Sequence, residues 1–143
     1  MYLIDLKPGG FENFSASYVI KGKRAAIVET GPRLTVENLL AGLDEIGIKR
    51  EEIDYVAVSH IHIDHAGGAG TLLPHLPNAR LLVHEKGAPH LIHPEKLWIS
   101  SLQVLGEIAE MYGEFEPVPE ERVLIAKEGM VIDLGKGVDL KVL

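Results

Sequence analysis

Four side chains that bind metal ions well lie within six residues near the middle of this chain of 143 residues. The segment reads His60-Ile-His62-Ile-Asp64-His65, the pattern HxHxDH, and it follows an apolar run typical of a β-strand. In an extended chain residues i and i+2 project to the same side, so His60 and His62 can bind one ion together. Asp64 and His65 come where the backbone must turn into a glycine-rich segment, and they can face a second ion.

Imidazole and carboxylate ligands suit zinc, and they also suit iron or manganese. Two such ions about 3.5–4 Å apart can share a hydroxide and stabilise both oxygens of a hydrolysis. A histidine-rich turn can also be a solvated loop or the cap of the next helix. Four ligands at fixed spacing, between a strand and a glycine-rich turn, favour the metal site.

Alternating apolar patterns and turn residues predict an α/β chain with one domain. Strands are expected at 2–6, 17–20, 25–30, 53–59, 80–83, 123–126, 130–134 and 138–143, and helices at 35–46, 71–76 and 94–112. The 94–112 segment is the clearest helix, because its apolar residues recur every three or four positions and Gly113 can end it. Ligands bind beyond the carboxyl ends of strands in such sheets, which is where the motif lies.

Composition limits the possible partners and the compartment. The net charge is −7 without a basic cluster, which argues against a dedicated nucleic-acid-binding surface. The chain has no cysteine, which excludes disulfides and cysteine chemistry. It shows neither a signal-peptide pattern nor an apolar run of 18 residues, so we expect a cytoplasmic protein with no membrane partner.

The motif and its surroundings resemble the metallo-β-lactamase fold superfamily. Residues 54–59 are similar to the strand before the motif, and Ala66-Gly67-Gly68 to the exit into a helix. Residues 25–31 are similar to an earlier strand that ends in an acidic-Thr-Gly turn, with Glu29 where the family usually has Asp. The resemblance covers residues 1–143 and implies half of a four-layer αββα sandwich, a mixed β-sheet flanked by helices.

The same resemblance implies roles for the site residues. His60 and His62 would hold one metal ion, and Asp64 and His65 a second one. Asp64 would also be catalytic, orienting the hydroxide and accepting a proton. The expected cofactor is zinc, with two ions in the complete site and iron or manganese as alternatives. Gly67-Gly68 would let the backbone approach the metal centre closely.

The expected activity is a metal-dependent hydrolase that acts on a small ester, lactone or thioester. The alternatives are a mononuclear-iron dioxygenase of the same superfamily, a phosphodiesterase or nuclease, and an inactive half-domain that needs a partner segment. The diiron, flavin-linked branch typically has Glu at the position of His62, so the histidine argues against it.

The last expected strand, 138–143, carries a further implication of the resemblance. In the family such a strand leads to the next metal-binding histidine, then to a bridging aspartate and a final histidine. We therefore expect residues 1–143 to be one domain truncated at its C-terminal end. A second half-domain or a second copy in a homodimer would complete the fold and the site, and the chain alone would be inactive.

The sequence assigns no definite role to Trp98 or to the four histidines outside the motif. Trp98 lies on the 94–112 helix, and in relatives a helix after the motif often borders the substrate cleft, so Trp98 could line a pocket. His75, His84, His90 and His93 lie outside any family motif, and surface or capping roles are expected for them.

Overall fold

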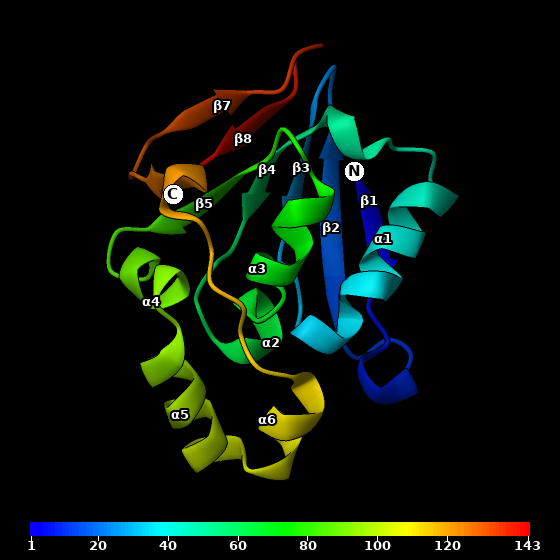
Figure 1. Ribbon diagram of the computed structural model, residues 1–143. Helices are drawn as coiled ribbons and strands as arrows, with labels where there is room; N and C mark the ends of the chain where they lie inside the picture. Colours follow the sequence, from blue (N-terminus) through cyan, green and yellow to red (C-terminus); the bar gives the residue numbers. More distant parts are fainter.

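A computed structural model, which describes all 143 residues, contains a six-stranded mixed sheet with the helices on one face (Figure 1). The strand order is β1-β2-β3-β4-β5-β6. The β1–β2 and β2–β3 pairs are antiparallel, whereas the β3–β4, β4–β5 and β5–β6 pairs are parallel. This confirms the expected sheet class. The strands are β1 Tyr2–Asp5, β2 Ala16–Lys21, β3 Ala25–Val28, β4 Ile53–Ala57, β5 Arg80–His84 and β6 Val123–Ala126.

Six short helices and five single turns of 3-10 helix connect the strands. The α-helices are α1 Val36–Glu45, α2 Ile63–Ala66, α3 Ala69–Leu72, α4 Ala88–Ile92, α5 Glu95–Leu105 and α6 Glu107–Tyr112. The 3-10 turns are η1 Pro8–Gly10, η2 Arg33–Thr35, η3 Arg50–Glu52, η4 Leu73–His75 and η5 Glu120–Arg122. A bilayer-spanning helix, which would have to be longer and more apolar than any of these, is absent.

The two faces of the sheet are covered differently, because side chains alternate between the faces along each strand. On β5, Leu81 and Val83 join the main core of 28 buried residues beneath the helices, whereas Leu82 points to the other face. There it meets a hairpin of β7 (Val131–Asp133) and β8 (Asp139–Lys141), which lies over part of this face (Figure 1). This second core has only four buried residues. The face is therefore only partly covered.

Two details of the helices differ from the sequence-based prediction. The expected helix 94–112 is two helices, because Gly106 has φ 55° and ψ −123°, which no helical residue adopts. The expected helix 71–76 begins earlier, at Ala69, and becomes the 3-10 turn η4 where Pro74 lacks an N–H to continue the α-helical bonds. The short helices α2 and α4 were not predicted, since one or two turns leave little periodicity in a sequence.

Arg122 fixes the α3–η4 segment to the neighbouring strands. Its guanidinium donates to the carbonyl of Leu73 at 2.6 Å, to that of Ala79 at 2.6 and 3.0 Å, and also to that of Leu76. One cation thus binds three carbonyls, which lie in η4 and in the loop that follows it. The contact joins η5, just before β6, to the segment that follows the HxHxDH motif.

Candidate metal centre

The HxHxDH segment runs from the end of β4 into the first turn of α2. His60 and His62 lie in the loop, and Asp64 and His65 lie in the helical turn. His62 is still extended, with φ −60° and ψ 150°, and its carbonyl accepts the N–H of His65 at 3.0 Å. The turn anticipated at Asp64 is therefore the start of a helix. It lies at the carboxyl end of the parallel strands, as expected for a ligand site.

The fold brings the four predicted side chains together. The ring centroid of His60 lies 4.0 Å from that of His65 and 4.8 Å from that of His62. Asp64 Oδ2 lies 3.4 Å from His65 Nε2. His60, His62 and Asp64 are exposed and His65 is partly exposed, so the cluster is open to solvent on one side.

Glu29, at the end of β3, holds the ring of His65. Its Oε2 lies 2.9 Å from His65 Nδ1, and its Oε1 accepts the N–H of Ser59 at 2.9 Å. An ionised carboxylate only accepts hydrogen bonds, so the proton of a neutral His65 is on Nδ1 and Nε2 carries the lone pair. Nε2 is the atom that lies beside Asp64. Glu29 has φ 68°, an unusual conformation for a residue other than glycine.

The residues after Glu29 bind the backbone of the motif. Thr30 is fully buried, and its N–H donates to the carbonyl of His65 at 2.9 Å. Its Oγ1 lies 3.0 Å from the same oxygen. The N–H of Gly68 donates to the carbonyl of Gly31 at 2.8 Å. These bonds fix α2 against the end of β3, so the side chains of both elements have defined relative positions.

The pKa of His60 is lowered, first by partial desolvation of its ring and then by the nearby His65 and His62, so its neutral form is favoured at neutral pH. Its Nδ1 lies 2.8 Å from Ser59 Oγ, which leaves Nε2 free. A neutral imidazole with a free nitrogen is the form that binds a metal ion.

The imidazole and carboxylate groups of this cluster are of the types that bind divalent cations. The lone pair of His65 Nε2 and the carboxylate of Asp64 face each other as two acceptors, an arrangement that a cation or a proton between them would stabilise. No three imidazoles or carboxylates of the chain are placed so that they could hold an ion by themselves. The four side chains thus lie close together, but the chain alone does not supply the three protein ligands of a typical catalytic zinc.

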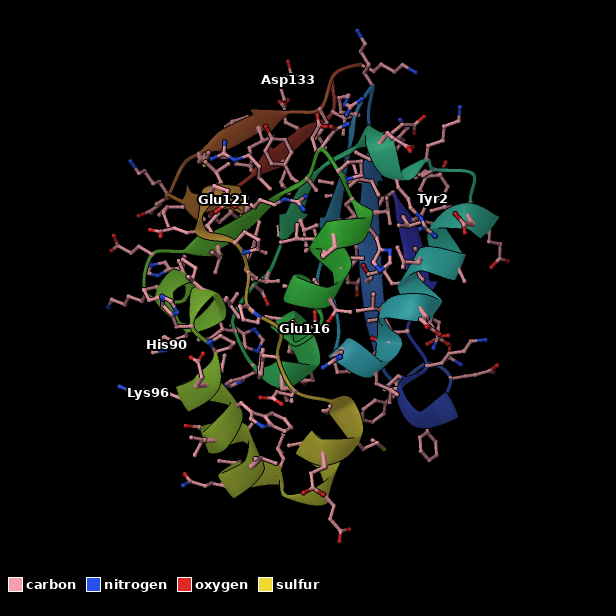
Figure 2. All side chains as sticks on the ribbon, in the orientation of Figure 1. Tyr2, His90, Lys96, Glu116, Glu121 and Asp133 are labelled. Carbon is pink, nitrogen blue, oxygen red and sulfur yellow. The ribbon has the colours of Figure 1, made fainter.

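The remaining histidines lie outside this cluster or at its border. His84 and His90 line, together with His60, a cavity of about 410 Å³ beside the motif. His84 Nδ1 accepts the N–H of Lys86 at 3.1 Å, a local bond at the strand end. His90 is exposed at the outer edge of α4 (Figure 2). His75 and His93 are exposed as well.

The surroundings of Trp98 and of Gly68 bear on two further expectations. Trp98 packs partly buried against the main core, and the pocket beside α5 is lined by other residues of that helix. A Cβ at Gly68 would lie 2.8 Å from Val36 Cγ2 and 3.1 Å from the Gly31 carbonyl oxygen, so this glycine permits close packing onto α1 and the β3 turn.

Glu29 is the residue whose contact the sequence reasoning left open. The sequence placed it at the end of a strand, but the spacing does not tell which group it would reach. The available signal was an acidic residue at the carboxyl end of the strand that neighbours the motif strand. Only the parallel pairing of β3 with β4 puts its carboxylate beside both Ser59 and His65.

Comparisons with known proteins agree with this fold. The family model described as metallo-beta-lactamase superfamily matches residues 10–139. A probable metallo-hydrolase from Methanocaldococcus jannaschii is 32% identical over 97 residues, which cover 68% of this chain and 46% of that protein. A metallo-beta-lactamase fold-containing protein from Sulfurisphaera tokodaii is 28% identical over 136 residues, which cover 90% of this chain and 48% of that protein.

The solved structures match over most of this chain. An archaeal metallo-beta-lactamase superfamily protein from Sulfolobus tokodaii superposes with a TM-score of 0.78 at 25% identity, over 94% of this chain and 51% of the other. A subclass B3 metallo-beta-lactamase isolated from a soil metagenome library superposes with a TM-score of 0.70 at 22% identity, over 94% and 46%, which shows the shared fold. The chain thus spans about half the length of these relatives.

Proposed function

Because the chain belongs to the metallo-beta-lactamase superfamily, we propose that it carries the first part of a metal-dependent hydrolase site for a small ester, lactone or thioester. The family, and its relative named a probable metallo-hydrolase, support a hydrolase that uses a divalent metal. The substrate class and the choice of zinc are our inference from the ligand types.

The observation that carries the proposal is the convergence of three imidazoles and a carboxylate on one side of the β4–α2 crossover. His60 and His62 would hold one ion, and His65 with Asp64 a second one. Glu29 would keep the proton of His65 on Nδ1, so that Nε2 stays available, as outer partners of metal-bound histidines generally do. When bound, the metal would lower the pKa of a water molecule and polarise the carbonyl of the substrate.

Asp64 has the second role in this proposal. Its carboxylate lies at the exposed mouth of the cluster, 3.4 Å from His65 Nε2. There it would orient the attacking water and accept its proton, while the hydrogen-bonded turn at Glu29 and Thr30 keeps the histidine rings in place. We assign catalysis to Asp64 and metal binding to all four motif residues.

Each pair of ligands needs at least one more donor. Since the chain spans about half of its relatives and its second sheet face is only partly covered, we propose that a second half-domain or a second copy of the chain completes the fold and the site. A stable small sheet normally buries its apolar face, and large exposed patches mark interfaces.

Zinc titration by calorimetry, followed by elemental analysis, tests the proposal. We expect zinc uptake by the wild type and by His75→Ala, a matched control on an exposed histidine outside the site, and a loss of at least tenfold in affinity for His60→Ala. Hydrolysis of p-nitrophenyl acetate, with zinc added, should appear only in fractions that contain more than one chain. Equal zinc affinity in all three proteins, or one bound iron per chain, would contradict a zinc hydrolase.

A further inference from the structure

A second pocket adjoins the motif on the side of the helices. It has a volume of about 530 Å³ and lies among α2, α5 and α6, which meet at one end of the molecule (Figure 1). Small-molecule sites usually have about 300–1,000 Å³, so this pocket has the size of a ligand site. It is lined by His62, Ile63, Asp64, Leu97, Ser100, Ser101, Val104, Leu105, Ile108 and Tyr112.

The walls of this pocket come from apolar side chains that the core leaves uncovered. Helix α5 has no fully buried residue, although its residues at 97, 104 and 105 are apolar. Val104 is 81% exposed and Ile108 on α6 is 50% exposed. The break at Gly106 turns α6 away from the line of α5, so the two helices present these side chains to a common space.

The pocket has a polar end and an apolar end. His62 and Asp64 of the motif form the polar end, and Asp64 is its only carboxylate. Tyr112, which is buried, and Asp64 both line this part of the pocket. Ser101 Oγ donates to the carbonyl of Leu97 at 2.9 Å, so this hydroxyl is already paired within its helix.

From this arrangement we propose that the α5–α6 pocket binds a straight, uncharged alkyl or acyl chain of the substrate and directs its ester or thioester group to the motif. The inference rests on the proposed function and specifies its substrate class. No lysine or arginine lines the pocket, so a charged group on the tail of a substrate would find no partner at the apolar end. An apolar chain matches the remaining lining.

The test adds linear alcohols from butanol to octanol to the metal-free full chain. Binding of each alcohol is measured from the NMR signals of the methyl groups of the protein. We expect the methyl signals of Val104, Leu105 and Ile108 to shift, with affinity rising about fourfold for each added methylene. Shifts confined to other methyl groups, or an affinity independent of chain length, would overturn the proposal.

Three variants on α5 make the test specific. Val104→Ser should weaken hexanol binding at least threefold, whereas Ile99→Ser should leave it unchanged, because Ile99 is 53% exposed on the same helix but does not line the pocket. Ser100→Leu adds apolar lining and should tighten binding about threefold. Identical affinities in all variants would count against the pocket, and the gain expected from Ser100→Leu cannot come from unfolding.

The two proposals fail in different ways. The protein could take up zinc and hydrolyse an acetate ester, yet hydrolyse butyrate, hexanoate and octanoate esters no faster. That result would overturn the acyl pocket and leave the hydrolase intact. Chain-length-dependent alcohol binding by a protein that takes up no zinc would support the apolar pocket and overturn the hydrolase, because the probes need no metal.

Discussion

At the scale of single residues, Glu29 links the HxHxDH motif to the neighbouring strand. Its two carboxylate oxygens bind the N–H of Ser59 and face His65 Nδ1, so one side chain links the ends of two strands to a candidate metal ligand. The carboxylate is largely buried, with 12% of the side chain exposed, so solvent screens these contacts only partly. The extra methylene of Glu relative to the usual Asp accompanies a left-handed backbone at this position.

Glu29→Gln tests this role with little change in size. The amide oxygen can still accept the N–H of Ser59, but its NH₂ group would face His65 Nδ1 and favour the wrong tautomer. We expect a 10- to 100-fold loss in zinc affinity, the range typical for outer partners of metal-bound histidines. Calorimetric titration measures it, with Glu37→Gln, an exposed residue on α1, as the control. An unchanged affinity in Glu29→Gln would show that the carboxylate does not orient the ring.

At the scale of elements, the segment after the motif depends on Arg122. The guanidinium binds three backbone carbonyls at the end of η4 and in the following loop, and only a planar group with several donors can reach all of them. This contact holds α3 and η4 against the sheet, and with them the glycine-rich exit of the metal motif.

Arg122→Lys should therefore destabilise the protein although it keeps the charge. A lysine can satisfy at most some of these carbonyls, and a hydrogen bond from a charged group contributes about 1.5–3 kcal/mol. Because Arg122 is partly exposed, we expect a loss of about 1–3 kcal/mol in the free energy of unfolding, measured by urea denaturation. Arg80→Lys on the exposed side of β5 serves as the control. Equal stabilities of the two variants would exclude this role of Arg122.

The loop η3, just before β4, carries a pH-dependent contact. Lys21 Nζ lies 3.0 Å from Glu52 Oε2, and this ion pair is the main reason why the pKa of Glu52 is lowered. A carboxylate with a lowered pKa contributes stability above about pH 4.5 and loses it as the pH falls, because the unfolded state takes up the proton first. The effect is small, since solvent reaches both groups.

Lys21→Met should remove this part of the pH dependence. We expect the melting temperature of the variant to fall less steeply than that of the wild type between pH 5 and pH 3. Lys141→Met on β8 is the control, because no ion pair involves that residue. A parallel decline in the wild type and both variants would refute the assignment to Glu52.

At the scale of the whole molecule, the sheet is covered well on one face and poorly on the other. The β7–β8 hairpin buries only a small cluster, and a cavity of about 930 Å³ remains between the end of β8 and the β5–β6 edge. Ala57, Ala126 and Leu140 line this cavity, which also reaches Ser59 beside the motif. Whatever packs on this face would thus also approach the candidate metal centre.

We expect the chain to associate through this face and Ala126→Glu to prevent the association. A carboxylate in an apolar interface loses its hydration without gaining a partner, so the dimer constant should weaken at least tenfold. Sedimentation equilibrium measures the mass, and Val131→Glu on β7, where the native side chain is 54% exposed, is the control. A wild-type chain that stays monomeric at all concentrations would contradict a homodimer and leave a separate half-domain as the partner.

The sequence alone determined the elements with strong local signals. Strand 123–126 agrees residue for residue with β6, and the motif lies at the end of β4 as predicted. These features depend on apolar alternation and on ligand spacing, which are visible in a short window of sequence. The prediction of one continuous helix over 94–112 was wrong at Gly106, because a glycine within an apolar pattern does not reveal whether its φ will be positive.

Tertiary structure alone decided which groups meet. The contact of Glu29 with His65 joins residues 36 positions apart, and it exists because β3 and β4 pair in parallel. The apolar pocket beside Asp64 depends on the fold between α5 and α6, and the half-covered sheet depends on where the β7–β8 hairpin packs. Local patterns specify elements, whereas the distances between elements arise from packing of the whole chain, which no short window of sequence contains.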